Sequence, residues 1–202
     1  MEFKVKKCES LYKGFFQFNK YHISNQLFAG GWSDIYTREL FERGHAAAIL
    51  LFDQNRDQLV FVEQFRPGAM QTEQSPWLIE LVAGMIEEGE LPEEVVKRES
   101  IEESGSEVKR LVKMCEYLVS PGGTTERIWL YLGEIDSTKT AQFAGLDNEN
   151  EDIKVHCIST QKAFDWLGSG KINNAMTIIA VQWLKLKLMQ QTPLWEYAAV
   201  ED

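Results

Sequence analysis

Apolar residues in much of the chain come in short runs separated by polar turns, a pattern typical of β-strands. Residues 46–52 form the longest run, and a polar loop connects it to a second run at 59–64, which favours a hairpin. A run of seven residues is too short to cross a bilayer. Further strands are predicted at 15–22, 78–82, 111–119, 127–134 and 154–158.

Helical signals are fewer and more specific. One helix is expected to begin near Pro92, because proline and acidic residues favour a first turn, and Gly105 suits the left-handed position at its end. Residues 174–190 carry apolar side chains at helical spacing, and Thr160 can cap a helix over 161–168. Together these elements predict an α/β fold in which a mixed sheet packs between helices.

The pattern divides the chain into two parts. Residues 1–40 hold short alternating segments and a glycine turn, which we interpret as a small N-terminal β element, and residues 41–202 form the main domain. Residues 135–152 are one long polar stretch, and a loop of that length in a compact domain is either disordered or functional. With 202 residues, 44% of them hydrophobic, the chain is long enough to bury a sizeable core.

Charge and cysteine content narrow the class of protein. A net charge of −10 argues against a nucleic-acid or anionic-membrane partner, which would need a cationic face. An anionic substrate would therefore depend on metal ions and a few local arginines. The widely spaced Cys8, Cys115 and Cys157 favour small buried thiols in a reducing compartment over disulfides or a zinc site. We expect a soluble, cytoplasmic protein.

Acidic residues gather at the end of the predicted helix that begins near Pro92. At helical spacing, Glu99, Glu102 and Glu103 share one arc of the surface, where their like charges repel. A divalent cation would convert this repulsion into attraction, and oxygen ligands suit Mg²⁺ or Mn²⁺. The alternative is an ordinary solvated acidic face. We expect Glu103 at the exposed end of the helix.

A longer spacing pattern surrounds these acids. Gly, five residues, Glu, seven residues, Arg-Glu, two residues, Glu-Glu, one residue and Gly occur together from Gly84 to Gly105. This arrangement resembles the Nudix box, the signature of hydrolases that cleave nucleoside diphosphates linked to another moiety. Two positions that are usually apolar in the box hold Ser100 and Ser106. Arg98 can pair with Glu102 along the helix.

The resemblance to the Nudix family implies a fold and a metal site. The implied fold is the Nudix α/β/α sandwich, here with a small N-terminal β domain. The implied Mg²⁺ ligands are the Ala83 carbonyl with Glu99 and Glu103, and the ion takes further ligands from waters and a pyrophosphate. Glu102 stays open between a catalytic contact through metal-bound water and a structural pair with Arg98.

Other stretches resemble one subgroup, the bacterial ADP-ribose pyrophosphatases. Pro121 lies 16 residues beyond Gly105, as in that subgroup, and the segments at 41–48, 63–67 and 148–152 are also similar. The resemblance implies hydrolysis of ADP-ribose to AMP and ribose 5-phosphate. It assigns Glu149 as the general base and Glu151 as a further metal ligand.

The same resemblance implies a set of substrate contacts and a homodimer. In the family's dimers, the positions of Arg38 and Arg43 reach the substrate after exchange of the N-terminal segment between subunits. Alternatives are another nucleoside diphosphate sugar, such as GDP-mannose, or a Nudix-fold protein that binds ADP-ribose without cleaving it. The implied substrate-binding residues are Phe15, Phe16, Arg38, Glu39, Arg43, Arg66, Met85, Ser120, Pro121, Gly122 and Glu126.

Overall fold

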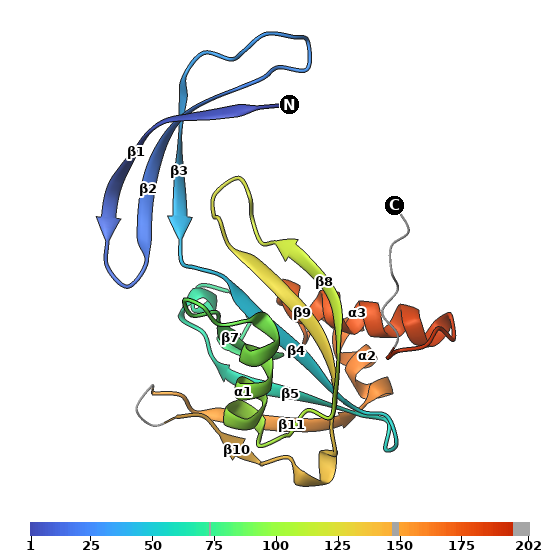
Figure 1. The fold of residues 1–202 in the computed structure, drawn as a ribbon. Coiled ribbons are helices and arrows are strands. Elements are labelled where there is room, and N and C mark those ends of the chain that lie inside the picture. The colour runs from blue at the N-terminus through green and yellow to red at the C-terminus, as the bar shows by residue number, and fades with distance from the viewer. Residues whose placement is uncertain (73, 147–149, 196–202) are drawn as a thin grey trace. The chain divides into compact units, whose positions relative to one another are not determined.

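The computed structural model describes residues 1–72, 74–146 and 150–195. The chain divides into two compact units. The first contains residues 1–45 and 117–128, and the second contains residues 46–116 with the described part of 129–202. Figure 1 traces both units along the chain.

The first unit is built on a three-stranded antiparallel sheet. Its strands are β1 (Phe3–Lys13), β2 (Gln17–Asn25) and β3 (Tyr36–Glu42), in the order β1-β2-β3. The strand predicted at 15–22 is confirmed, although it begins two residues later and extends further. A parallel bridge between Phe41 and Thr124 joins the 117–128 segment to β3.

The second unit contains an eight-stranded sheet, which runs β10-β11-β5-β4-β9-β8, with β6 paired to β5 and β7 paired to β4. The hairpin predicted from the two longest apolar runs is confirmed by the antiparallel pairing of β4 and β5. The bounds of the strands are β4 (Ala46–Asp53), β5 (Gln58–Phe65), β6 (Trp77–Glu80), β7 (Val82–Met85), β8 (Arg110–Leu118), β9 (Arg127–Glu134), β10 (Phe143–Ala144) and β11 (Ile153–Ser159).

Helices cover both faces of this sheet: α1 (Pro92–Ser104) lies in front in Figure 1, and α2 (Thr160–Gly168) and α3 (Ala175–Met189) lie behind. Val95 and Val96 of α1 pack in one core with alternate residues of β4 and β5. Two 3₁₀ turns, η1 (Pro67–Ala69) and η2 (Ser137–Lys139), complete the elements. The predicted mixed sheet between helices is confirmed, and among the described residues none of the helices could span a membrane.

Four sequence-based expectations are wrong in detail. The strand predicted at 78–82 is divided between β6, which pairs with β5, and β7, which pairs with β4. The cap of α2 is Ser159, whose hydroxyl accepts a hydrogen bond from the Lys162 amide at 3.3 Å, and Thr160 is the first helical residue. The stretch at 135–152 is not one loop, because it contains η2 and β10. The cysteines are free but not all buried: Cys8 is exposed on the outer strand β1, and Cys157 is exposed on β11.

Candidate functional site

A strand, a loop and a helix place the acidic motif. Gly84 in β7 pairs with Ala47 in β4, and the strand passes so close to α1 that a side chain at Gly84 would overlap the Glu99 carboxylate. A side chain here would push the Glu99 carboxylate out of its position. The first glycine of the motif therefore leaves room for the Glu99 carboxylate between β7 and the helix that carries the acids.

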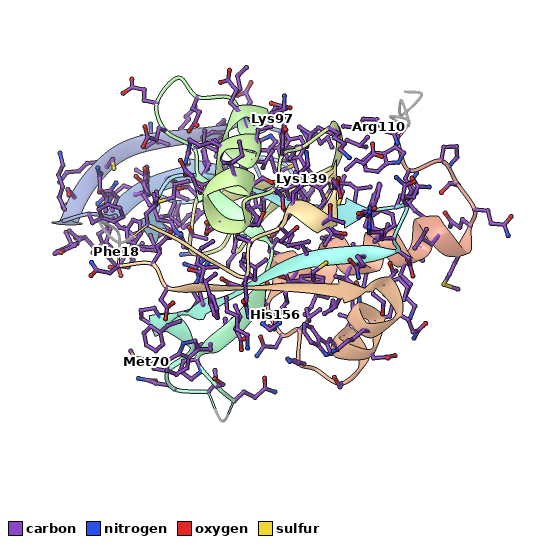
Figure 2. The ribbon with its side chains drawn as sticks, turned by 90° about the horizontal axis from the view of Figure 1, so that it is seen from below. Phe18, Met70, Lys97, Arg110, Lys139 and His156 are labelled. Atoms are coloured by element: carbon purple, nitrogen blue, oxygen red, sulfur yellow. The ribbon has the colours of Figure 1, made fainter. Side chains whose placement is uncertain are left out.

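The ends of α1 follow the chemistry predicted for them. Pro92 occupies the first turn with Glu93 and Glu94, where the fixed φ of proline and the helix dipole favour these residues. Gly105 ends the helix with φ of 68°, in the left-handed region. Lys97 marks the solvent side of the helix (Figure 2).

The three carboxylates differ in depth. Glu103 is only 3% exposed, against 14% for the side chain of Glu99 and 33% for that of Glu102. The expectation of an exposed Glu103 is wrong, because its turn of α1 packs against β7. There the Ala83 amide donates a hydrogen bond to Glu103 Oε2 at 3.0 Å.

Arg98 organises the more exposed acids. Its Nη1 donates to Glu99 Oε1 at 2.7 Å and to Glu102 Oε2 at 3.1 Å, and its Nε donates to Glu90 Oε1 at 3.2 Å. The predicted pairing of Arg98 with Glu102 is confirmed. One guanidinium thus holds three carboxylates of the motif, which accounts for the presence of Glu90 and Arg98 in the same pattern.

Burial and mutual repulsion shift the acids toward their neutral forms. Burial raises the pKa of Glu103 to about 8, and the charges of Glu99 and Glu151 act in the same direction. Burial also raises the pKa of Glu99, although Arg98 opposes the shift. The carboxylate of Glu151 therefore lies close enough to influence both helical acids.

Arg66 enters the same region from the end of β5. Its Nε donates to Glu80 Oε2 at 2.7 Å, and Glu80 is 7% exposed on β6. The positive charge of Arg66 lowers the pKa of Glu103, so the two groups interact. Sequence reasoning missed Glu80, although a glutamate inside a strand predicted at 78–82 was a signal that a partner was needed.

The donor set fits a hard divalent cation. Glu99, Glu103 and Glu151 supply carboxylate oxygens, which Mg²⁺ and Mn²⁺ prefer. In the described part of the chain, no three acidic, histidine or cysteine side chains already converge as a complete ligand cage. Arg98 and the Ala83 amide engage two of these carboxylates instead. A bound cation would thus compete with Arg98 for Glu99.

Other predicted residues of this unit lie near the motif or outside the described chain. Met85 ends β7, where it pairs with Ala46 and is partly exposed. The Glu151 amide donates to the Leu146 carbonyl at 3.3 Å. The predicted base Glu149 lies outside the described residues.

The first unit gathers a second group of predicted residues. The Arg43 guanidinium lies 5.4 Å from the centre of the Phe16 ring, and its Nε is 3.6 Å from Glu126 Oε1. Phe15 and Phe16 stack edge to face at 4.8 Å. Glu126 is 6% exposed, so this cation is the partner of a buried acid.

The remaining predicted residues of the first unit are more dispersed. Arg38 stacks over Tyr36 at 4.7 Å and donates to the Thr37 carbonyl, whereas Glu39 lies 3.9 Å from Lys20. The structure thus brings Arg43, Phe16 and Glu126 together but gives Arg38 and Glu39 other partners. Ser120, Pro121 and Gly122 form an exposed turn, in which the Ser120 carbonyl accepts from the Gly123 amide at 2.9 Å.

Outside these groups, the histidines have structural partners. His156 on β11, labelled in Figure 2, bonds to Glu63 of β5 at 2.7 Å through Nε2. His22 pairs with Glu9 across β1 and β2, and the ring of His45 accepts from the Arg127 amide. These contacts account for the three histidines as structural residues.

The chain is similar to a known protein family and to proteins of two bacteria. A model of the NUDIX domain matches residues 42–198. An ADP-ribose pyrophosphatase of Escherichia coli K12 is 51% identical over 178 residues, which cover 88% of this chain and 85% of the relative. An ADP-ribose pyrophosphatase of Haemophilus influenzae is 44% identical over 191 residues, covering 93% and 88%.

More distant similarity extends to a second substrate group and to solved structures. A GDP-mannose pyrophosphatase of Escherichia coli O1:K1 is 34% identical over 152 residues, covering 75% of this chain and 78% of the relative. A crystal structure described as an ADP compounds hydrolase superposes with a TM-score of 0.71 at 18% identity, covering 95% of this chain and 96% of that one. At that identity the superposition supports the fold alone.

Proposed function

The chain belongs to the Nudix family, and we propose that it hydrolyses ADP-ribose to AMP and ribose 5-phosphate with a divalent metal, Mg²⁺ or Mn²⁺. The observation that carries this proposal is the buried Glu103 beside Glu99, whose carboxylate lies against Gly84 of β7. The two relatives named ADP-ribose pyrophosphatase, each similar over most of the chain, favour ADP-ribose over GDP-mannose.

Different residues of the second unit would bind the metal, position its ligands and accept the proton during hydrolysis. When bound, the metal ion would lower the pKa of a water and neutralise charge on the pyrophosphate. Glu99, Glu103, Glu151 and the Ala83 carbonyl would hold it, and Arg98 keeps Glu99 and Glu102 in place. We assign Glu149 to take the proton of the attacking water while a phosphorus–oxygen bond of the pyrophosphate breaks.

Arg66 suits contact with the phosphates. Its hydrogen bond to Glu80 uses Nε, so the rest of the guanidinium, on a side chain 42% exposed, can meet an anion. Met85 at the end of β7 would contact the substrate through its backbone. These assignments keep cationic groups near an anionic ligand in a protein whose net charge is −10.

We also propose a homodimer in which the first unit serves the partner's site. Arg43, Phe16 and Glu126 form a compact group that can meet the adenosine and ribose parts of the substrate, with Arg38, Glu39 and the turn at 120–122 as further contacts. The buried residues of the described strands β1–β3 are the polar Asn19 and Ser24. A sheet without buried apolar residues is not stable alone, which supports a covering partner.

A reducing, cytoplasmic setting completes the proposal. Cys8, Cys115 and Cys157 are all free thiols, as a reducing compartment would keep them.

Product analysis tests the activity. Purified protein with Mg²⁺ is expected to release AMP and ribose 5-phosphate from ADP-ribose, with a higher kcat/KM than for GDP-mannose. In ¹⁸O-labelled water, the product that carries the label reports which phosphorus is attacked. Preference for GDP-mannose would favour the other sugar nucleotide, and binding of ADP-ribose without cleavage would show a non-catalytic protein.

The metal assignment is tested with Glu103→Gln. Loss of the charge should lower kcat by about 10²–10³-fold, as for removal of a single electrostatic contact to a transition state. The amide oxygen of the new glutamine can still accept from the Ala83 amide, so the melting temperature should not fall. Activity within about threefold of wild type at saturating Mg²⁺ would reject the metal role.

Mixed subunits test the shared site. An Arg38→Ala subunit is combined with a Glu149→Gln subunit. The homodimer of each variant is expected to be inactive. If Arg38 serves the partner's site, one site of each heterodimer carries both changes and the other is intact, so activity returns to about half by the two-fold symmetry. No recovery, with heterodimers seen by native mass spectrometry, would show that each site uses one chain.

A further inference from the structure

Gln64 is a buried polar residue without a visible purpose in the fold. It lies in β5 and is 5% exposed, and its Nε2 has no hydrogen-bond partner among the described residues. A buried donor that lost its water without gaining a partner destabilises the folded state. Such a group therefore calls for an explanation outside the ligand-free chain.

The side chain lies on the face of the sheet that carries the acidic motif. Val60 and Val62 of β5 pack in the core with Val95 and Val96 of α1. Because successive side chains of a strand alternate between faces, Gln64 shares the face of Val60 and Val62. Figure 1 shows α1 lying over β5 on this face.

The pairing of β5 with β6 defines the neighbours more closely. Gln64 is opposite Leu78, and the preceding residue of the same face, Val62, is opposite Glu80. Glu80 in turn accepts the hydrogen bond of Arg66, which follows Gln64 on its strand face. Along this face of the strand, Gln64 thus lies between the core residue Val62 and Arg66, the cation assigned to the phosphates.

The acceptors of this region already have donors. Glu80 is bonded to Arg66, Glu103 to the Ala83 amide, and Glu99 to Arg98. An amide nitrogen carries two N–H donors and no charge, so it can approach an anion in an acidic site without attracting the surrounding carboxylates as strongly as a cation would. A ligand oxygen would supply the acceptor that the described residues do not give to the Gln64 amide nitrogen.

We propose that the Gln64 side-chain amide donates a hydrogen bond to a pyrophosphate oxygen of the bound substrate. This inference rests on the proposed function, because it takes the pyrophosphate of that substrate as the ligand. It makes Gln64 a substrate-binding residue whose donor is left unpaired until the ligand arrives. The ligand-free protein is correspondingly less stable than a variant with an apolar side chain of the same shape.

The experiment measures stability and binding separately in Gln64→Met, a nearly isosteric change. Without ligand and with the metal chelated, the melting temperature should rise by about 2–4 °C, because an unpaired donor is removed. With Mg²⁺, affinity for a non-hydrolysable ADP-ribose with a methylene-bridged pyrophosphate should fall by about 10–100-fold in calorimetry, as expected for a bond to a charged group.

Thr160→Val provides a matched control. Thr160 is also buried, and its Oγ1 also has no hydrogen-bond partner among the described residues, but it begins α2, outside the acidic motif. The valine should raise the melting temperature in the same way and leave the affinity for the analogue unchanged. The control separates removal of an unpaired group from loss of a ligand contact.

Two results would overturn the proposal. A less stable Gln64→Met with wild-type affinity would mean that the amide has a structural partner, and a more stable variant with wild-type affinity would mean that it is only a packing defect. Gln64→Leu replaces Gln64→Met if the latter does not fold. If the wild type binds no ADP-ribose analogue but cleaves another sugar nucleotide, the proposed function fails, and the same variants are measured with the bridged analogue of that compound.

Discussion

Strands β4 and β1 belong to one chain but have opposite environments. In β4 every residue after Ala46 is buried, whereas all eleven described residues of β1 are exposed except the half-buried Glu9. β4 lies in the centre of a sheet with helices on both faces, and β1 is the outer strand of a three-stranded sheet. The continuous apolar run of β4 and the polar-rich sequence of β1 thus go with different sources of stability.

The difference shows where the protein can hold a precise arrangement of groups. Glu103 and Glu99 are positioned by a helix packed on the buried sheet, so burial and close contact determine their depth. In the small sheet, contacts are made by polar pairs, such as Asn19 with Glu42 at 2.8 Å. Polar pairs near the surface stabilise weakly, so this sheet requires further support.

Hydrogen exchange should show the largest effect. Amides of β4 and β5 are expected to exchange only through global unfolding, at about 5–15 kcal/mol, whereas those of β1–β3 should exchange through local opening. Mass spectrometry of peptides from the two sheets measures the exchange rates of both groups of amides, and the measurement is repeated at lower protein concentration. If a partner covers the small sheet, only its protection falls as the protein is diluted. Equal and concentration-independent protection would remove the contrast.

Truncating one isoleucine in each unit gives the next largest effect. Ile49 is fully buried in β4, so Ile49→Ala should destabilise the protein by about 2–5 kcal/mol in urea unfolding. Ile35 of the first unit is 59% exposed, so the same substitution there should cost less than about 0.5 kcal/mol. A cost at Ile35 comparable with that at Ile49 would reveal a core supplied by a partner.

A smaller, pH-dependent effect is expected at the end of β4. Burial tends to raise the pKa of Asp53, but hydrogen bonds from the Ser137 amide and hydroxyl, at 2.9 and 2.7 Å, and from Arg56 outweigh it and lower the pKa below 3.8. The ionised form therefore stabilises the fold above pH 3.8, and this contribution is lost as the pH falls through the folded-state pKa.

Asp53→Asn should accordingly destabilise the protein by about 1–2 kcal/mol at neutral pH, since it replaces a charged acceptor. The difference from wild type should shrink as urea unfolding is repeated from neutral pH down to about pH 3. Asp165→Asn, at an exposed position of α2, serves as a control with little effect. A loss at Asp53 that is independent of pH would contradict the ionic role.

The smallest effect is expected in the small sheet. Tyr21 on β2 donates a hydrogen bond to Glu42, and this bond, together with burial, raises the pKa of the Tyr21 hydroxyl. Glu42→Gln should lower that pKa toward its ordinary value of 10.0, seen as a difference in the ultraviolet titration. The cost in unfolding free energy should stay below about 1 kcal/mol, as for other partly exposed pairs. A larger cost would mean that the Tyr21–Glu42 pair contributes as much to the free energy of unfolding as contacts in the buried sheet do.

The comparison also shows how far local sequence signals predicted the fold. The start of α1 at Pro92, its left-handed end at Gly105 and the strand at 127–134 were predicted correctly, since each depends on residues close in the chain. The cap of α2 was placed one residue late, because serine and threonine adjoin there and both can accept the bond. Neighbouring residues of like chemistry leave such a choice to the folded backbone.

The sequence predicted which kinds of residue form the site, but it did not predict how deeply they are buried or which partners they have. The spacing of the acids identified Glu99, Glu102 and Glu103 as one face, and Arg98 as a partner of Glu102. It did not reveal that Glu103 is buried against Ala83, that Glu80 holds Arg66, or that the Gln64 amide lacks a partner. Each of these facts joins residues 14 or more positions apart or depends on which strand lies alongside.

The amino-acid sequence by itself determined the helices, the long central strands and the identity of the acidic motif, because helix ends, strand periods and fixed spacings are local properties of the chain. Only the tertiary structure decided which acids are buried, which cation meets which carboxylate, and which sheet has an apolar core. Those properties depend on desolvation and on contacts between distant segments, and both arise only when β7, β5 and α1 pack together.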